Sequence, residues 1–117
     1  MATTLETQVR RDGDIATVAL TGDVDGSARE ALDRAYTEAS GSGTLLLDFG
    51  DVSYINSTGI ALIVGLLGRA RADGVSVAAC RLTPHYREIF EITRLSDFMS
   101  IHADEPSARA AAQGGEQ

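Results

Sequence analysis

Residues 44–60 read TLLLDFGDVSYINSTGI, in which the pattern of a strand is followed by the pattern of a helix start. It opens with a short apolar run, residues 44–49, which is typical of a strand covered on both faces of its sheet. It closes with a helix start, because apolar residues recur downstream at helical spacing until Gly74. We expect a loop to lift Ser57 to the rim of the sheet. There the free N–H groups of the first helical turn would favour a negative charge.

The overall composition limits what such a site can do. The chain has 117 residues, of which 44% are hydrophobic, so it fits one domain with a single core. Its net charge of -7 argues against a nucleic-acid or anionic-membrane partner, since both bind clustered positive charge. No stretch approaches the roughly 18 apolar residues of a membrane span, and the first residues lack the basic and apolar regions of a signal peptide. We therefore expect a cytoplasmic protein.

Missing residue types exclude several kinds of chemistry. All ten basic residues are arginine, so there is no lysine for a Schiff base or a phosphate-binding P-loop. Cys80 is the only cysteine, which excludes a disulfide framework and a thiolate metal cluster. His85 and His102 show no metal-ligand spacing. A serine nucleophile elbow needs glycine two positions before the serine, where Ile55 stands. We predict a noncatalytic protein that holds no metal and no cofactor.

Strand and helix patterns alternate along the rest of the chain. Residues 6–10 and 14–20 predict a hairpin around Asp12-Gly13. Residues 21–26 have the composition of a turn-rich loop, after which Ser27 is expected to cap a helix. The remaining expected elements are a strand over 75–80, a helix opened by Pro84 with Ile89, Phe90 and Ile92 on its apolar face, a short buried segment with Leu95, Phe98, Met99 and Ile101, and an alanine-rich helix started by Pro106.

This alternation predicts a single α/β domain over residues 1–112. Its mixed, mostly parallel sheet should open with the N-terminal hairpin and be covered by helices. Residues 113–117 are expected to form a flexible tail. Sites in such domains gather where strands end and helices begin, which selects residues 22–26 and 55–59.

Two stretches resemble the STAS-domain family of bacterial anti-sigma factor antagonists. They are residues 18–25 (VALTGDVD) and 47–60 (LDFGDVSYINSTGI), and the likeness continues through Gly74, Pro84 and residues 89–95. In that family the first hydroxyl of an Asp-Ser-Ser/Thr-Gly motif is phosphorylated by a partner that is both anti-sigma factor and serine kinase. By position, the resemblance makes Ser57 the acceptor.

The resemblance also implies partners. The unphosphorylated antagonist would bind the kinase and release a sigma factor, and a metal-dependent serine/threonine phosphatase would restore this form. We expect a monomer or weak homodimer. If the two selected loops adjoin, the carboxylates of Asp23, Asp25 and Asp51 would lie near the phosphate and add like charge. The expected partner-binding residues are Asp23, Asp25, Asn56, Ser57, Thr58, Gly59 and Leu62.

Other interpretations of these residues stay open. Asn56 departs from the family pattern, because an Asp usually precedes the acceptor, so the alternative is a non-phosphorylated scaffold or a ligand-sensing module. Ser57 and Thr58 could be helix caps alone, and Asp23 and Asp25 could be turn formers. Leu62 and Leu66 form a second apolar stripe, expected to be covered by a neighbouring helix rather than left exposed for docking. Cys80 is expected to be buried and inert.

Overall fold

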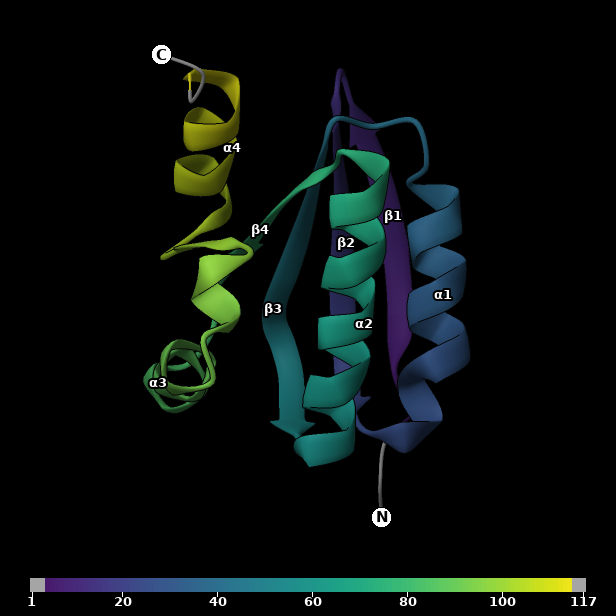
Figure 1. The fold of residues 1–117 in the computed structure, drawn as a ribbon, viewed down its shortest axis with the longest axis vertical. Helices are drawn as coiled ribbons and strands as arrows, with labels where there is room; N and C mark the ends of the chain where they lie inside the picture. The colour runs from purple at the N-terminus through teal and green to yellow at the C-terminus, as the bar shows by residue number, and fades with distance from the viewer. Residues whose placement is uncertain (1–3, 115–117) are drawn as a thin grey trace.

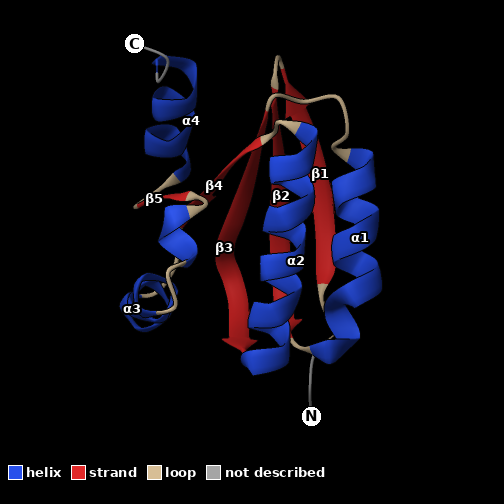
Figure 2. Cartoon of the chain, in the orientation of Figure 1, coloured by secondary structure: helices blue, strands red, loops and turns tan. Residues whose placement is uncertain are grey.

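The computed structural model describes residues 4–114. Five strands form one sheet in the order β1-β2-β3-β4-β5, with β1 and β2 antiparallel and the other pairs parallel. Figure 2 shows this sheet with its helices. The predicted mixed α/β sheet with an N-terminal hairpin is confirmed. The strands are β1 (Glu6–Asp12), β2 (Ile15–Val24), β3 (Thr44–Ile55), β4 (Ser76–Cys80) and β5 (Ser100–His102).

Two long helices lie side by side on one face of the sheet (Figure 1). They are α1 (Arg29–Glu38) and α2 (Ser57–Asp73), each of which connects two parallel neighbouring strands. Right-handed crossovers that advance in one direction across a sheet place their helices on the same face. The strands follow one another across the sheet in chain order, and this order never reverses. The sheet therefore lacks the switch point at which doubly wound folds form a ligand crevice.

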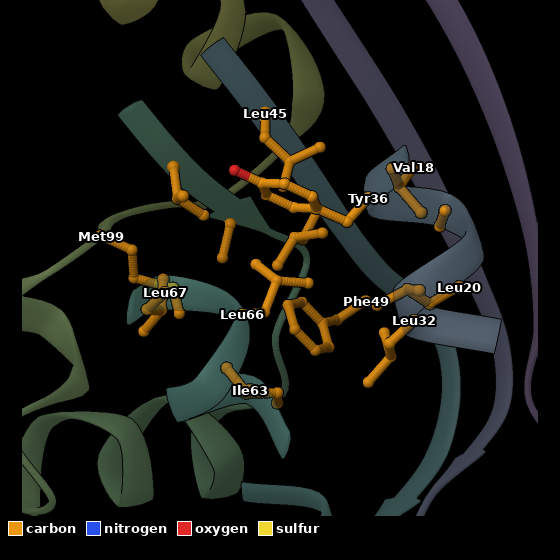
Figure 3. Packing of buried hydrophobic residues seen from close by; sticks show 14 of the residues in the cluster. Val18, Leu20, Leu32, Tyr36, Leu45, Phe49, Ile63, Leu66, Leu67 and Met99 are labelled. Carbon is orange, nitrogen blue, oxygen red and sulfur yellow. The ribbon is translucent and has the colours of Figure 1, made fainter. Parts of the chain in front are cut away.

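The main core lies between this face and its helices. Inward side chains of β2 and β3, among them Val18, Leu20 and Phe49, pack against Leu32 of α1 and Ile63 of α2 (Figure 3). The helix α3 (Pro84–Ile92) adds Phe90, whose ring meets that of Phe49 edge to face at a centroid distance of 5.7 Å. Phe90 is fully buried, so α3 is anchored to the same core.

The opposite face of the sheet is covered by α4 (Glu105–Gly114). A smaller apolar cluster lies beneath it, formed by Ile15, Leu46, Ala78, Cys80 and Ala108. The prediction that Cys80 is buried at a strand end is confirmed. Burial, followed by the nearby Asp48 carboxylate, raises the pKa of its thiol to about 12.

Arg109 of α4 forms three side-chain hydrogen bonds, two of which connect the helix to the sheet. Its guanidinium donates to Glu105 Oε2 at 2.8 Å, to Asp12 Oδ2 at 3.0 Å and to the buried Thr17 hydroxyl at 3.0 Å. Arg10 donates to the same Glu105 carboxylate. The bond from Arg109 is the main reason that the pKa of Glu105 is lowered. An alanine-rich helix with little apolar area is thus positioned by charged hydrogen bonds.

Several sequence-based boundaries and contacts were wrong. Residues 21–24, expected in a loop, extend β2 and pair with β3, where two register shifts each place one extra residue on β3 as a bulge. Asp25 rather than Ser27 caps the next helical turn, η1 (Gly26–Ala28). Ile92, expected to be buried, is 71% exposed, and Phe98 of the expected buried segment is 52% exposed.

The C-terminal helix runs to Gly114, two residues into the expected tail, and residues 115–117 lie outside the described part. Within residues 4–114, no helix has the length and apolar character needed to cross a membrane.

Candidate functional site

The predicted site lies where β3 runs directly into α2. The strand ends at Ile55, and Asn56 is the N-cap of the helix, so the expected loop between them is absent. The Asn56 side-chain oxygen accepts from the Gly59 N–H at 2.8 Å, and its carbonyl accepts from the Ile60 N–H at 2.9 Å. One N–H group expected to be free for an anion is therefore already bonded by the cap.

The end of β2 lies against this helix start. The Asn56 N–H donates to the Val24 carbonyl at 3.2 Å. Gly59 is buried, and a Cβ at this position would lie 1.9 Å from the Val24 carbonyl oxygen. A side chain cannot fit there, because the neighbouring atom belongs to backbone rather than to a flexible side chain. Gly59, predicted to bind a partner, is thus placed to support the site from below.

The helix α3 also contacts the end of β3. The Ile55 N–H donates to the Tyr86 hydroxyl at 3.0 Å, and Tyr86 lies in the first turn of α3, which Thr83 caps. Sequence reasoning missed Tyr86, since nothing in the local pattern of α3 links it to residue 55. The junction is therefore fixed by β2 on one side and α3 on the other.

Ser57 and Thr58 are exposed in the first turn of α2. The loop after β2 approaches them, since a Cβ on Gly26 would lie 3.5 Å from the Thr58 methyl group. Asp25 precedes that glycine, and its carboxylate accepts from both the hydroxyl and the N–H of Ser27, which lower its pKa. Residues 24–26 and 56–59 therefore adjoin, which is the condition for Asp25 to add charge near Ser57.

The other two predicted carboxylates lie on strands rather than in a loop. Asp23 is buried within β2, where it pairs across the sheet with Tyr54, so it is no turn former. Asp51 pairs with Thr21, three residues before the pair of Val24 with Ile55, so it lies about 10 Å along the sheet from the end of β3, at roughly 3.3 Å per residue. Because β3 continues through Asp51 to Ile55, Asp51 lies on the strand and not in a loop beside Ser57.

A groove of about 370 Å³ leads from Thr58 along the line between α1 and α2. Leu62 and Leu66 lie in it opposite Leu32 of α1, so the second apolar stripe is covered by a neighbouring helix, as predicted. An ion pair between Arg69 and Asp33, 3.3 Å long, spans the two helices. Leu62, the last predicted partner-binding residue, is only partly buried and lies one turn after Thr58 in the same groove.

Three features of this surface indicate what kind of ligand it suits. The hydroxyl side chains are exposed on a surface, the sheet has no switch-point crevice, and residues 4–114 hold no group of three or more potential metal ligands. Such a site suits recognition by another protein better than enclosure of a substrate.

The chain belongs to the STAS-domain family. The family model described as "Mlab, STAS domain" matches residues 7–101. A Bordetella bronchiseptica protein described as an anti-sigma factor antagonist, BtrV, is 36% identical over 72 residues, which cover 62% of this chain and 60% of that protein. The relatives are regulatory proteins rather than enzymes, which confirms the predicted noncatalytic class.

Solved structures show the same fold. An anti-sigma factor antagonist from Mycobacterium paratuberculosis has a TM-score of 0.77 at 19% identity, covering 97% of this chain and 99% of that one. The Bacillus cell fate determinant SpoIIAA in its phosphorylated form has a TM-score of 0.68 at 19% identity, covering 90% of this chain and 98% of that one. SpoIIAA in its unphosphorylated form has a TM-score of 0.71, again at 19% identity, covering 92% and 98%.

Proposed function

We propose that this protein is a cytoplasmic anti-sigma factor antagonist that binds an anti-sigma factor with serine kinase activity, and that phosphorylation of Ser57 ends this binding. The observation that carries the proposal is the exposed Ser57 hydroxyl at the first residue of a helix that Asn56 caps. A relative of the same fold, SpoIIAA, is described in both unphosphorylated and phosphorylated forms. The contact surface would include Asp25, Thr58 and Leu62, with Asp23 and Gly59 supporting it from below.

The electrostatics of the site support a switch without refolding. A phosphate on Ser57 would add roughly 1.5 to 2 negative charges. The helix start tolerates an anion through its dipole, while the carboxylate of the adjoining Asp25 adds like charge. The partner would then meet a cluster of acceptor oxygens in place of a neutral hydroxyl. A phosphatase of the metal-dependent serine/threonine class would reverse the change.

The direct test starts by finding the partner. A Ser57→Ala form cannot accept phosphate at this position and should retain an anti-sigma factor in a pull-down from the source cells. With that partner and ATP, wild type should gain one phosphate, which peptide mass spectrometry should map to Ser57. Phosphate found only on Thr58, or none with a kinase proven active on another substrate, would contradict the proposal.

The charge effect can be measured separately from the modification. Ser57→Asp should weaken binding to the same partner at least tenfold, or about 1.4 kcal/mol, because a carboxylate enters the contact surface beside Asp25. The fold should persist, since an acid in the first turn suits the helix dipole. Calorimetry measures the affinity, with Ser57→Ala as the neutral control. Equal affinities for all three forms would remove Ser57 from the interface.

Asn56 favours one alternative, a scaffold that assembles with signalling proteins and is never phosphorylated. Its amide keeps the cap but supplies no carboxylate beside the acceptor hydroxyl. The discriminating observation is the phosphorylation state of Ser57 in growing cells. A ligand-sensing role has less support, because the sheet lacks a switch-point crevice.

A further inference from the structure

A second groove lies on the other side of α2, away from α1. It is lined by Val64, Leu67 and Arg71 of α2 and by Arg94 and Phe98 of the segment that follows α3, and it encloses about 260 Å³. Val64 is 50% exposed and Phe98 is 52% exposed, although both are large and apolar. Leu67 forms the buried floor. Figure 3 shows Leu67 near Met99, which anchors this segment to the core.

Two of the exposed large apolar side chains lie together in this groove. Val64 and Phe98 line the same pocket, and Ile92, at 71% the most exposed large apolar residue described, directly precedes Thr93 of its lining. Isolated apolar residues on a surface need no explanation, whereas a contiguous patch with a polar rim marks an interaction site. The α1–α2 groove differs, because an ion pair between Asp33 and Arg69 spans it.

The rim of this groove is positively charged in a chain whose net charge is -7. The Arg71 guanidinium lies 5.7 Å from the centre of the Phe98 ring and forms no ion pair with any carboxylate of residues 4–114. Arg94 is held by Asp97 at 2.8 Å, in an exposed pair that a second carboxylate can share. An occupant that complements this rim therefore carries negative charge.

We propose that the groove binds an acidic amphipathic helix of a partner protein. The length from Val64 to Arg71 is about 10 Å at 1.5 Å per residue, which matches two turns of a docked helix. Apolar side chains one turn apart would fill the groove beside Phe98, as in other helix-in-groove complexes. Flanking carboxylates would meet Arg71 and Arg94. Val64 lies about 10 Å along α2 from Ser57, so this contact goes beyond the proposed phosphorylation switch and does not depend on it.

A defined peptide probe tests the surface. The probe is a labelled 14-residue helix with leucines at positions i, i+4 and i+7 and glutamates flanking them, and its affinity is measured by fluorescence anisotropy. We expect saturable binding to the full chain that weakens as salt screens the charges. Phe98→Ala should weaken it at least tenfold. Tyr54→Ala is the matched control, because Tyr54 is 51% exposed on β3, and it should leave the affinity unchanged.

Charge reversal provides a second, independent test of the groove. Arg71→Glu should weaken binding of the acidic peptide at least tenfold and improve binding of a peptide with lysine in place of glutamate. Arg69→Glu makes the same change two residues away on the opposite side of α2. It should change the affinity for neither peptide. Circular dichroism checks that each variant folds.

Three outcomes would overturn the proposal: no saturable binding, equal losses at the target and control residues, or a wild-type dimer in sedimentation that Phe98→Ala dissociates. The last would assign the groove to a second copy of the chain.

Discussion

A Gly59→Ala variant should lose about 3 kcal/mol of folding free energy, which would lower its melting temperature by roughly 10 °C. The added methyl group would lie 1.9 Å from the Val24 carbonyl oxygen, and no rotamer change can relieve contact with backbone. The start of α2 would have to move away from β2, and the bond from the Asn56 N–H to Val24 would break with it. Thermal unfolding followed by circular dichroism measures the loss.

Gly65 provides the matched control within the same helix. It is exposed, and a Cβ there meets nothing within 4 Å. Gly65→Ala should therefore stabilise the protein by roughly 0.5 to 1 kcal/mol, since glycine costs helix stability without a compensating contact. Opposite signs at the two positions would establish close approach as the role of Gly59. A Gly59→Ala melting curve at or above that of wild type would contradict it.

Removing Arg109 should release α4 from the sheet. Arg109→Ala deletes three hydrogen bonds, including the one to the fully buried Thr17 hydroxyl, and should cost about 3 kcal/mol as a partly buried ion network is broken. Cys80 reports the event, because its thiol lies under α4 with a pKa raised to about 12. We expect its reaction with a disulfide reagent at neutral pH to accelerate at least tenfold.

Arg87→Ala is the control for that experiment. Arg87 forms an exposed pair with Glu91 at 3.7 Å within α3, and such surface pairs contribute at most about 1 kcal/mol. In the Arg87→Ala variant, the reactivity of the Cys80 thiol should match that of wild type. If Arg109→Ala leaves Cys80 as protected as before, the apolar cluster beneath α4 holds the helix without the charged contacts.

The sequence predicted the helices and strands correctly wherever the local pattern of residues decides the structure. The apolar run at 44–49 predicted the central strand, and Gly74, with its left-handed φ of 74°, ends α2 where expected. The extension of β2 through residues 21–24 was missed because Thr21-Gly22-Asp23 has the composition of a turn, while pairing with β3 decides the outcome. The cap at Asp25 was missed because Ser27, an equally good capping residue, is the group that it binds.

Contacts between distant parts of the chain could not be predicted. Arg109 and Asp12 are 97 residues apart, and no periodicity relates them. The same holds for the Tyr86 hydroxyl and the Ile55 N–H, which join α3 to the end of β3. Ser57, by contrast, could be placed from its neighbours alone, because a capped helix start after a strand is a local feature. Its support from β2 and α3 is tertiary and appears only in the folded chain.

The two outer strands of the sheet limit edge-to-edge pairing between copies of this protein. An open strand edge is a template for further strands and so for fibrils. Here β1 is rich in charged side chains, with Glu6, Arg10, Arg11 and Asp12 exposed, and β5 at the other edge is only three residues long. Both devices discourage growth of the sheet from copy to copy. A concentrated solution should therefore stay free of cross-β aggregates, and the helical surfaces remain the part of the molecule that others can bind.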